Sequence, residues 1–124
     1  MVMAFVNPAK VKAEELASLV KQIDALVAAN KSKQMRAFVN FIGEDRDELE
    51  EKAAEFGKAY KNVPVVVPVE FELGPKNYGV SPEAALTVLH CKGAKVSAND
   101  ALAAGKLDET TAKAILANAE KLVK

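Results

Sequence analysis

The chain has 124 residues, 50% of them hydrophobic and 27% charged, which is the composition of one soluble globular domain. Its 17 basic and 17 acidic residues cancel, which argues against a nucleic-acid binder, because that activity rests on a basic surface. The single cysteine excludes an internal disulfide. No apolar run approaches the roughly 20 residues of a membrane span. No signal peptide is recognisable, but a removed leader would leave the same sequence, so the compartment stays open.

The first strong signal is the stretch 2–30, a short apolar run followed by a long amphipathic pattern. Val2–Val6 contains no polar residue, which predicts a strand buried on both faces of a sheet. After Asn7-Pro8, apolar residues recur at spacings of three and four, which predicts a helix with one buried stripe. These residues are Leu16, Leu19, Val20, Ile23, Leu26 and Val27. A strand followed by a helix is the first half of a βαβ unit, whose functional site usually lies beyond the carboxyl end of the strand.

The same order repeats from residue 35. Met35–Ile42 is rich in Phe, Val and Ile and predicts a second strand, which Gly43 ends. The acidic run at residues 44–48 predicts the start of a second helix, because acidic side chains stabilise the positive end of the helix dipole. We expect this helix to reach Tyr60. Strands that alternate with helices indicate parallel strands joined by right-handed crossovers.

The next stretch predicts a strand of a different kind. Val63–Val69 is rich in strand-forming residues, but it contains Pro64 and Pro68. Proline cannot donate to a ladder, so we place this strand at an edge of the sheet. A connection at residues 73–82 follows, with one helical turn expected at residues 76–78.

The last third of the chain predicts a hairpin and a helix. Strands are expected at Leu86–Cys91 and Ala94–Ala98, joined by a turn at Lys92-Gly93. A connection with a helical turn is expected at Asn99–Gly105. Leu107 and Asp108 are then expected to be the staple residue and the N-cap of a helix at 109–123. We therefore expect an α/β fold with a mixed five-stranded sheet and helices on both faces. Val2–Val6 should be central, Val63–Val69 at one edge, and Val96 near the other.

This order of elements resembles the thioredoxin-like fold, and more closely its redoxin or peroxiredoxin-like branch. Three passages carry the resemblance. Val2–Val6 and the following helix resemble the first core strand and the active-site helix of that family. The segment GPKNYGV at 74–80 resembles the element that precedes the final hairpin, and Leu86–Val96 resembles the hairpin itself. The resemblance implies a thioredoxin-like three-layer sandwich formed by the whole chain.

The residues that carry activity in that family are missing. In active relatives, a Cys-x-x-Cys or a single reactive cysteine begins the first helix, where the dipole lowers the thiol pKa, but Asn7–Val11 contains no cysteine. Relatives of the thioredoxin type carry a cis-proline before the hairpin strand. Ala85 lies near that position, and Pro82 lies three residues earlier. The resemblance therefore implies a non-catalytic domain without a cofactor.

Cys91 and His90 are candidate reactive residues in the hairpin. A redox role for Cys91 needs an exposed thiolate beside a cation or a helix N-terminus, whereas a cysteine in an apolar strand is more often a small buried hydrophobe. His90 is its neighbour, yet successive side chains of a strand point to opposite faces. With no second histidine in the chain, the three or four ligands of a zinc site are lacking. We expect both residues to be structural, and no metal site.

Two charged groups could bind a ligand. The acidic residues at 44–51 lack the oxygen-ligand spacing of a calcium loop, and the first turn of a helix explains them. Lys10 and Lys12 lie near the start of the first helix, where an anion can bind. No glycines of a phosphate loop accompany them. We favour a helix that begins near Ala13, with both lysines solvated in a loop.

The function expected from these observations is a non-catalytic module that binds a protein or peptide through loops at 7–10, 43–45 and 81–85. The expected binding residues are Asn7, Pro8, Ala9, Lys10, Gly43, Pro82 and Ala85. The alternative is a thiol-dependent redox protein that acts through Cys91 or through cysteines on an N-terminal extension missing from this chain. A structural or engineered scaffold is a third reading. The sequence identifies neither the partner nor the oligomeric state.

Overall fold

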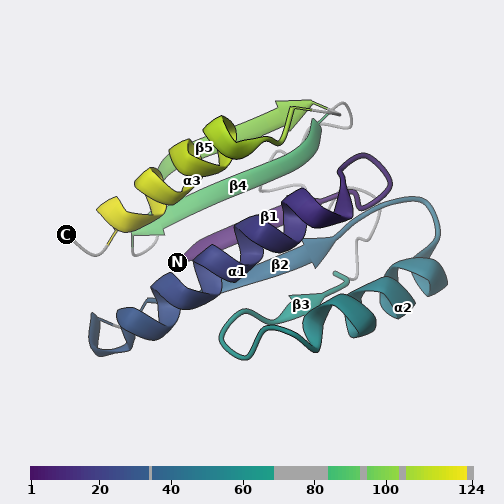
Figure 1. Ribbon diagram of the computed structural model, residues 1–124, viewed down its shortest axis with the longest axis horizontal. Helices are drawn as coiled ribbons and strands as arrows, with labels where there is room; N and C mark the ends of the chain where they lie inside the picture. The colour runs from purple at the N-terminus through teal and green to yellow at the C-terminus, as the bar shows by residue number, and fades with distance from the viewer. Residues whose placement is uncertain (34, 69–83, 93–94, 104–105, 123–124) are drawn as a thin grey trace.

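The computed structural model describes residues 1–33, 35–68, 84–92, 95–103 and 106–122. These residues form an α/β fold with a mixed five-stranded sheet in the order β3-β2-β1-β4-β5 (Figure 1). The elements are β1 (Val2–Val6), α1 (Ala13–Ala29), the 3₁₀ turn η1 (Lys31–Lys33), β2 (Ala37–Phe41), α2 (Arg46–Gly57), β3 (Val65–Val66), β4 (Ala84–Lys92), β5 (Lys95–Ala103) and α3 (Glu109–Lys121).

β1 is the central strand, as its unbroken apolar run predicts. It pairs in parallel with β2, where Ala4 lies opposite Val39, and antiparallel with β4, where Ala4 lies opposite Val88. All of its residues, Val2–Val6, are buried. A strand with neighbours on both sides and covered faces can carry apolar side chains throughout.

The three described helices lie on one face of the sheet (Figure 1). One core cluster contains Val2, Ala4 and Val6 of β1 together with buried residues of α1, α2 and α3. The reason is topological, because β1, β2 and β3 follow each other in one direction across the sheet. Two right-handed crossovers in the same direction place both of their helices on the same side. The expectation of helices on both faces is therefore wrong for the described helices.

The opposite face of the sheet has a second, smaller apolar cluster. It consists of Met3, Phe5, Ile42, Leu89 and Cys91, with Phe38 packed against it. These side chains alternate along the strands with those of the main core, as the pleat requires. No helix of the described ranges takes part in this cluster.

β3 is an edge strand, as its prolines predict, but it is only two residues long. Val65 and Val66 pair with Val39 and Asn40 of β2, and the Val39 N–H donates to the Pro64 carbonyl at 2.9 Å. Extending the ladder toward the start of β2 would require a donor at Pro64, and proline has no N–H. The proline therefore ends the pairing that the valines favour.

β5 is longer than its sequence pattern predicts. The interpretation of Asn99–Gly105 as a connection is wrong, because Asn99 pairs with Leu89 and Asp100 with Val88 within the β4–β5 ladder. Pairing along the full length of β4 overrides the turn preference of Asn and Asp. The turn expected at residues 76–78 and the loop residue Gly93 lie outside the described residues.

The helix starts agree with the predicted signals. α1 begins at Ala13 after Lys12, and both Lys10 and Lys12 are exposed. α3 begins with a reciprocal capping box, in which the Asp108 carboxylate accepts the Thr111 N–H at 2.9 Å and the Thr111 hydroxyl accepts the Asp108 N–H at 2.8 Å. Across the described part of the chain, no helix combines the length and the apolar character that crossing a membrane requires.

Candidate functional site

The junction between β1 and α1 is a tight turn set by Asn7 and Pro8. The Asn7 carbonyl accepts the Lys10 N–H at 2.9 Å, and the Asn7 side-chain oxygen accepts the Ala9 N–H at 3.0 Å. Asn is favoured at the first position of such a turn and Pro at the second. The Asn7 N–H in turn donates to the Ala85 carbonyl at 2.9 Å, which fixes the turn against β4.

The junction between β2 and α2 lies beside that turn. Asp45 caps α2 by accepting the Glu48 N–H at 3.2 Å. A Cβ at Gly43 would lie 3.3 Å from Leu49 Cδ2, so a residue without a side chain lets the loop pack closely on the helix. β1 and β2 are parallel, so their carboxyl ends lie at the same edge of the sheet.

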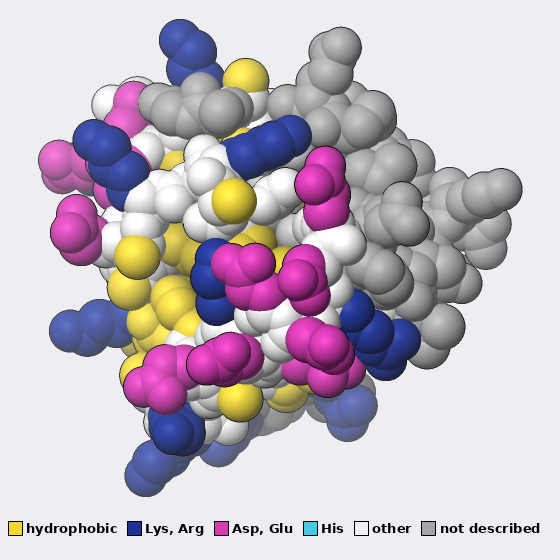
Figure 2. All heavy atoms as spheres, turned by 90° about the vertical axis from the view of Figure 1, so that its right-hand side faces the viewer, with side chains coloured by type: hydrophobic (Ala, Val, Ile, Leu, Met, Phe, Trp, Pro, Cys, Tyr) yellow, Lys and Arg dark blue, Asp and Glu magenta, His cyan; other side chains and the backbone are white. Residues whose placement is uncertain are grey.

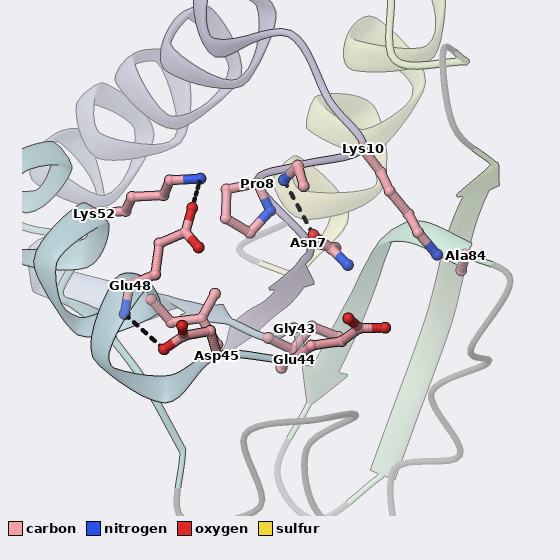
Figure 3. Close-up of a pocket in the computed structure, with 12 residues that line it drawn as sticks. Asn7, Pro8, Lys10, Gly43, Glu44, Asp45, Glu48, Lys52 and Ala84 are labelled. Carbon is pink, nitrogen blue, oxygen red and sulfur yellow. Dashed lines mark hydrogen bonds and ion pairs between the residues drawn. The ribbon is translucent and has the colours of Figure 1, made fainter.

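A hollow of about 580 Å³ opens at this edge. The face that carries it has acidic and basic side chains mixed together (Figure 2), and Figure 3 shows the hollow itself. It is lined by Asn7, Pro8, Ala9, Lys10, Ile42, Gly43, Glu44, Asp45, Glu48, Leu49, Lys52 and Ala84. The volume falls within the range of small-ligand sites, roughly 300–1,000 Å³. We refer to it as the junction hollow.

Two of the charged groups of the junction hollow pair with each other, and a third caps a helix. Lys52 lies 2.9 Å from the Glu48 carboxylate, one turn away on α2, and Asp45 holds the start of that helix. The described lining residues include no cysteine, histidine, serine, threonine or tyrosine. The groups that these residues offer are the carboxylates of Glu44, Asp45 and Glu48, the amines of Lys10 and Lys52, and the amide of Asn7.

A second, apolar hollow of about 350 Å³ adjoins the first and shares Pro8 and Lys52 with it. Its other lining residues are Val11, Ala13, Leu16, Phe41, Glu55 and Phe56. The rings of Phe41 and Phe56 contact each other, with centroids 5.5 Å apart. We refer to it as the apolar hollow. Together the two hollows form one surface with a polar half and an apolar half.

The structure brings together most of the binding residues expected from the sequence. Asn7, Pro8, Ala9, Lys10 and Gly43 line the junction hollow. Ala85 does not line it, because its side chain is buried and only its carbonyl supports the Asn7 turn. Pro82 lies outside the described residues.

The sequence reasoning missed the part of the site that α2 contributes. Glu48, Leu49 and Lys52 line the hollow, and they follow Asp45 at spacings of three, four and seven. That spacing marks one face of a helix, so continuing the helical pattern from the expected loop residue Asp45 would have found them. Ala84 at the start of β4 carries no such signal.

Cys91 lies in apolar surroundings on the other face of the sheet. Its side chain is 9% exposed and packs with Met3, Phe5 and Leu89 on the face of the sheet opposite the helices. Its backbone is fixed by two 2.7 Å hydrogen bonds to Met1, one through the Cys91 N–H and one through the Cys91 carbonyl. An apolar, enclosed site disfavours the thiolate on which redox chemistry depends, so the surroundings favour a structural role.

His90 is hydrogen-bonded, as expected of a structural histidine, and it is fully buried. Its Nε2 lies 2.8 Å from an oxygen of Asp100 on β5, and Asn118 of α3 donates to the same carboxylate at 3.1 Å. The three side chains link the hairpin to α3. No group of three or more metal-ligating side chains occurs within the described ranges.

Comparison of the chain with protein-family models, curated proteins and solved structures gives no match.

Proposed function

We propose that the chain is a non-catalytic, thioredoxin-like module that binds a protein or peptide segment across the junction hollow and the apolar hollow. The observation that carries the proposal is the composition of this surface. Polar groups and an apolar recess meet at the carboxyl ends of β1 and β2, and the described lining residues of the two hollows offer no thiol, hydroxyl or imidazole. Binding sites in α/β folds gather at this edge of the sheet.

A peptide fits this surface better than a small polar metabolite does. An apolar side chain of the ligand can enter the recess beside Phe41 and Phe56, while its main chain and polar groups face Lys52 and Lys10. Anchoring one apolar side chain in a pocket and surrounding it with polar contacts is a common mode of protein recognition.

The thioredoxin-like assignment is part of this proposal and rests on the sequence passages named above. Its support in the fold is the parallel β1–β2 pair, the antiparallel β4–β5 hairpin and the α3 helix that follows it. The placement of all three described helices on one face differs from the three-layer sandwich that the resemblance implies. The proposal of peptide binding depends on the two hollows and not on the family name.

The test is selection of peptides from a random displayed library against the immobilised protein, followed by titration of a selected peptide. We expect amide chemical shifts to change in Asn7–Lys10 and Gly43–Lys52, the segments that form the surface. Lys52→Glu should weaken binding at least about tenfold, because it places a second carboxylate beside Glu48.

Lys113→Glu is the matched control. Lys113 also pairs with a glutamate one turn away on a helix, at 3.4 Å from Glu109, but it lies on α3 outside both hollows. Equal loss of affinity in both variants would contradict the location of the site. Turnover of a disulfide or peroxide substrate by the chain would contradict the non-catalytic part of the proposal.

A further inference from the structure

A third hollow, of about 470 Å³, lies at the opposite end of the sheet from the junction hollow. Figure 1 shows this end at the left of the fold, where the N-terminus, the last turn of α1 and the start of β2 lie. Residues of α1, η1, β2 and β3 line it. The volume falls within the range of small-ligand sites, roughly 300–1,000 Å³. We refer to it as the amino-end hollow.

The short β3 strand gives the amino-end hollow its place in the fold. In the described sheet β3 pairs with Val39 and Asn40 of β2, and Pro64 cannot extend the ladder. Ala37 and Phe38 therefore lie beyond the last β3 pair, and both line the hollow. Ala37 belongs to the core on the helix side, whereas Phe38 packs against the cluster on the opposite face. The hollow thus reaches around the edge of the sheet.

The walls of the amino-end hollow are mostly apolar. Seven of its ten described lining residues have apolar side chains. Met1 and Val66, which are 44% and 42% exposed, are two of the three large hydrophobic side chains that are exposed in the described ranges. Exposed apolar side chains that gather in one place mark a binding site more often than scattered ones do. The flexible side chains of Met1 and Met35 can also adapt to the shape of a bound group.

The charged side chains among the described lining residues are both cations. They are Lys31 of η1 and Arg36, and both are exposed. Neither forms an ion pair within the described part of the chain. The Arg36 carbonyl accepts the Val2 N–H at 2.9 Å, which fixes the backbone of this residue against β1. The Asp24 carboxylate accepts the N–H of the lining residue Asn62 at 2.8 Å, but Asp24 does not line the hollow.

We propose that the amino-end hollow binds a fatty-acid-like ligand, a single alkyl chain that ends in a carboxylate. The alkyl chain lies against Phe38, Pro64 and Val66, and the carboxylate accepts hydrogen bonds from Arg36 and Lys31. Apolar walls with two cations that no described carboxylate neutralises are complementary to an anion with an apolar body. This inference does not depend on the proposed function, because the junction hollow lies at the other end of β1 and β2.

An alkyl chain suits these walls better than a peptide does. Each residue of a peptide brings a carbonyl and, unless it is proline, an N–H, and burying them without partners costs free energy. Among the described lining side chains, Asn62 alone can both donate and accept, since Lys31 and Arg36 only donate. An alkyl chain needs no such partner. The junction hollow differs in this respect, because it has carboxylates, amines and an amide.

The test is titration of the isotope-labelled protein with decanoate below its micelle concentration, followed by amide chemical shifts. We expect changes at residues 27–33 and 62–66 and none at 7–10. Decanoate should bind roughly tenfold more tightly than octanoate, because two further methylene groups are buried. It should also bind about fivefold more tightly than decanamide, which has a head group of the same size but no charge.

Arg36→Glu should weaken decanoate binding about tenfold, because it replaces a cation with a carboxylate that repels the ligand. Lys21→Glu is the matched control and should leave the affinity unchanged. Lys21 is also exposed and forms no ion pair within the described ranges, but it lies on α1 outside the hollow. Val66→Glu and Val96→Glu are a second pair, since both valines are exposed on edge strands. Only Val66→Glu should weaken binding.

The absence of saturable decanoate binding overturns the proposal, as do shift changes confined to the junction hollow or the apolar hollow. Equal affinity for decanoate and decanamide also overturns it, because the carboxylate would then contribute nothing. These readouts use the unaltered protein and do not depend on the folding of any variant. Equal loss of affinity in Arg36→Glu and Lys21→Glu would likewise contradict the location of the site.

Discussion

His90 of β4 and Asp100 of β5 are diagonal neighbours in the ladder, since His90 lies opposite Ala98 and Asp100 opposite Val88, and the imidazole Nε2 lies 2.8 Å from the carboxylate. The imidazole is fully buried and the Asp100 side chain is 21% exposed. Because a carboxylate only accepts hydrogen bonds, Nε2 carries the proton and donates it. Asn118 donates to the same carboxylate, so one acidic side chain joins two strands and a helix.

We expect Asp100→Ala to lower the free energy of unfolding by about 1–3 kcal/mol, because the buried imidazole loses the acceptor of its N–H. Urea unfolding followed by circular dichroism measures the change. Asn99→Ala is the control: Asn99 is the adjacent β5 residue and is exposed, and its loss should cost less than about 0.5 kcal/mol. Equal effects of the two substitutions would show that the carboxylate bridge does not stabilise the fold.

The N-cap of α3 should give the protein part of its acid sensitivity. The N–H of Thr111 stabilises the charged form of Asp108 and lowers the pKa of this carboxyl from its ordinary value of 3.8. A carboxyl whose pKa is lower in the folded state stabilises the protein above its unfolded pKa, and this contribution is lost as the pH falls through the folded pKa. The loss therefore occurs below about pH 4.

Asp108→Asn isolates this effect. Asparagine is also a good N-cap but does not ionise, so its cap should depend less on pH than that of Asp108. The melting temperature of the unaltered protein should exceed that of Asp108→Asn at about pH 6, and the difference should disappear toward about pH 2. A difference that stays constant over this range would rule out the charged cap as its source.

The sequence predicts those elements whose signals are local. The apolar run of Val2–Val6 marks the central strand, the prolines mark the β3 edge, and Leu107-Asp108 marks the start of α3. Each of these depends on neighbouring residues alone, through burial, donor loss or capping. The sequence fails where a partner distant in the chain decides the structure, as for Asn99 and Asp100, which become strand because β4 extends beside them.

In the candidate site, too, some parts have a local sequence signal and others depend on residues distant in the chain. The turn at Asn7-Pro8 can be expected from residue preferences, and the rule that sites lie beyond parallel strands indicates where to look. The contribution of Ala84 depends on the antiparallel placement of β4 beside β1, which no local pattern encodes. Likewise, the side on which the helices pack follows from the direction in which successive strands are added.

Gly57, the last residue of α2, packs closely against β3. A Cβ at this position would lie 3.3 Å from the Val65 Cβ on β3. Gly57→Ala should therefore not give the gain of about 1 kcal/mol expected from helix propensity. A Val65→Ala background removes the Cγ2 that would lie 3.6 Å away but keeps the Cβ at 3.3 Å, so the same substitution should be less unfavourable there than in the unaltered protein. Urea unfolding of the four proteins in this cycle measures the coupling, and a stability gain in the single variant would contradict the steric argument.

Cys91 should react with a thiol reagent only when the protein opens. Because its side chain is 9% exposed and packs against Met3 and Leu89, we expect native labelling to be slower than labelling in denaturant by a factor on the order of 10³ or more. Val66→Cys in a Cys91→Ser background is the positive control, since Val66 is 42% exposed and a thiol there should react at once. Rapid labelling of native Cys91 at neutral pH would instead indicate an accessible thiolate, and the alternative of a redox protein acting through this residue would then take precedence over the non-catalytic module.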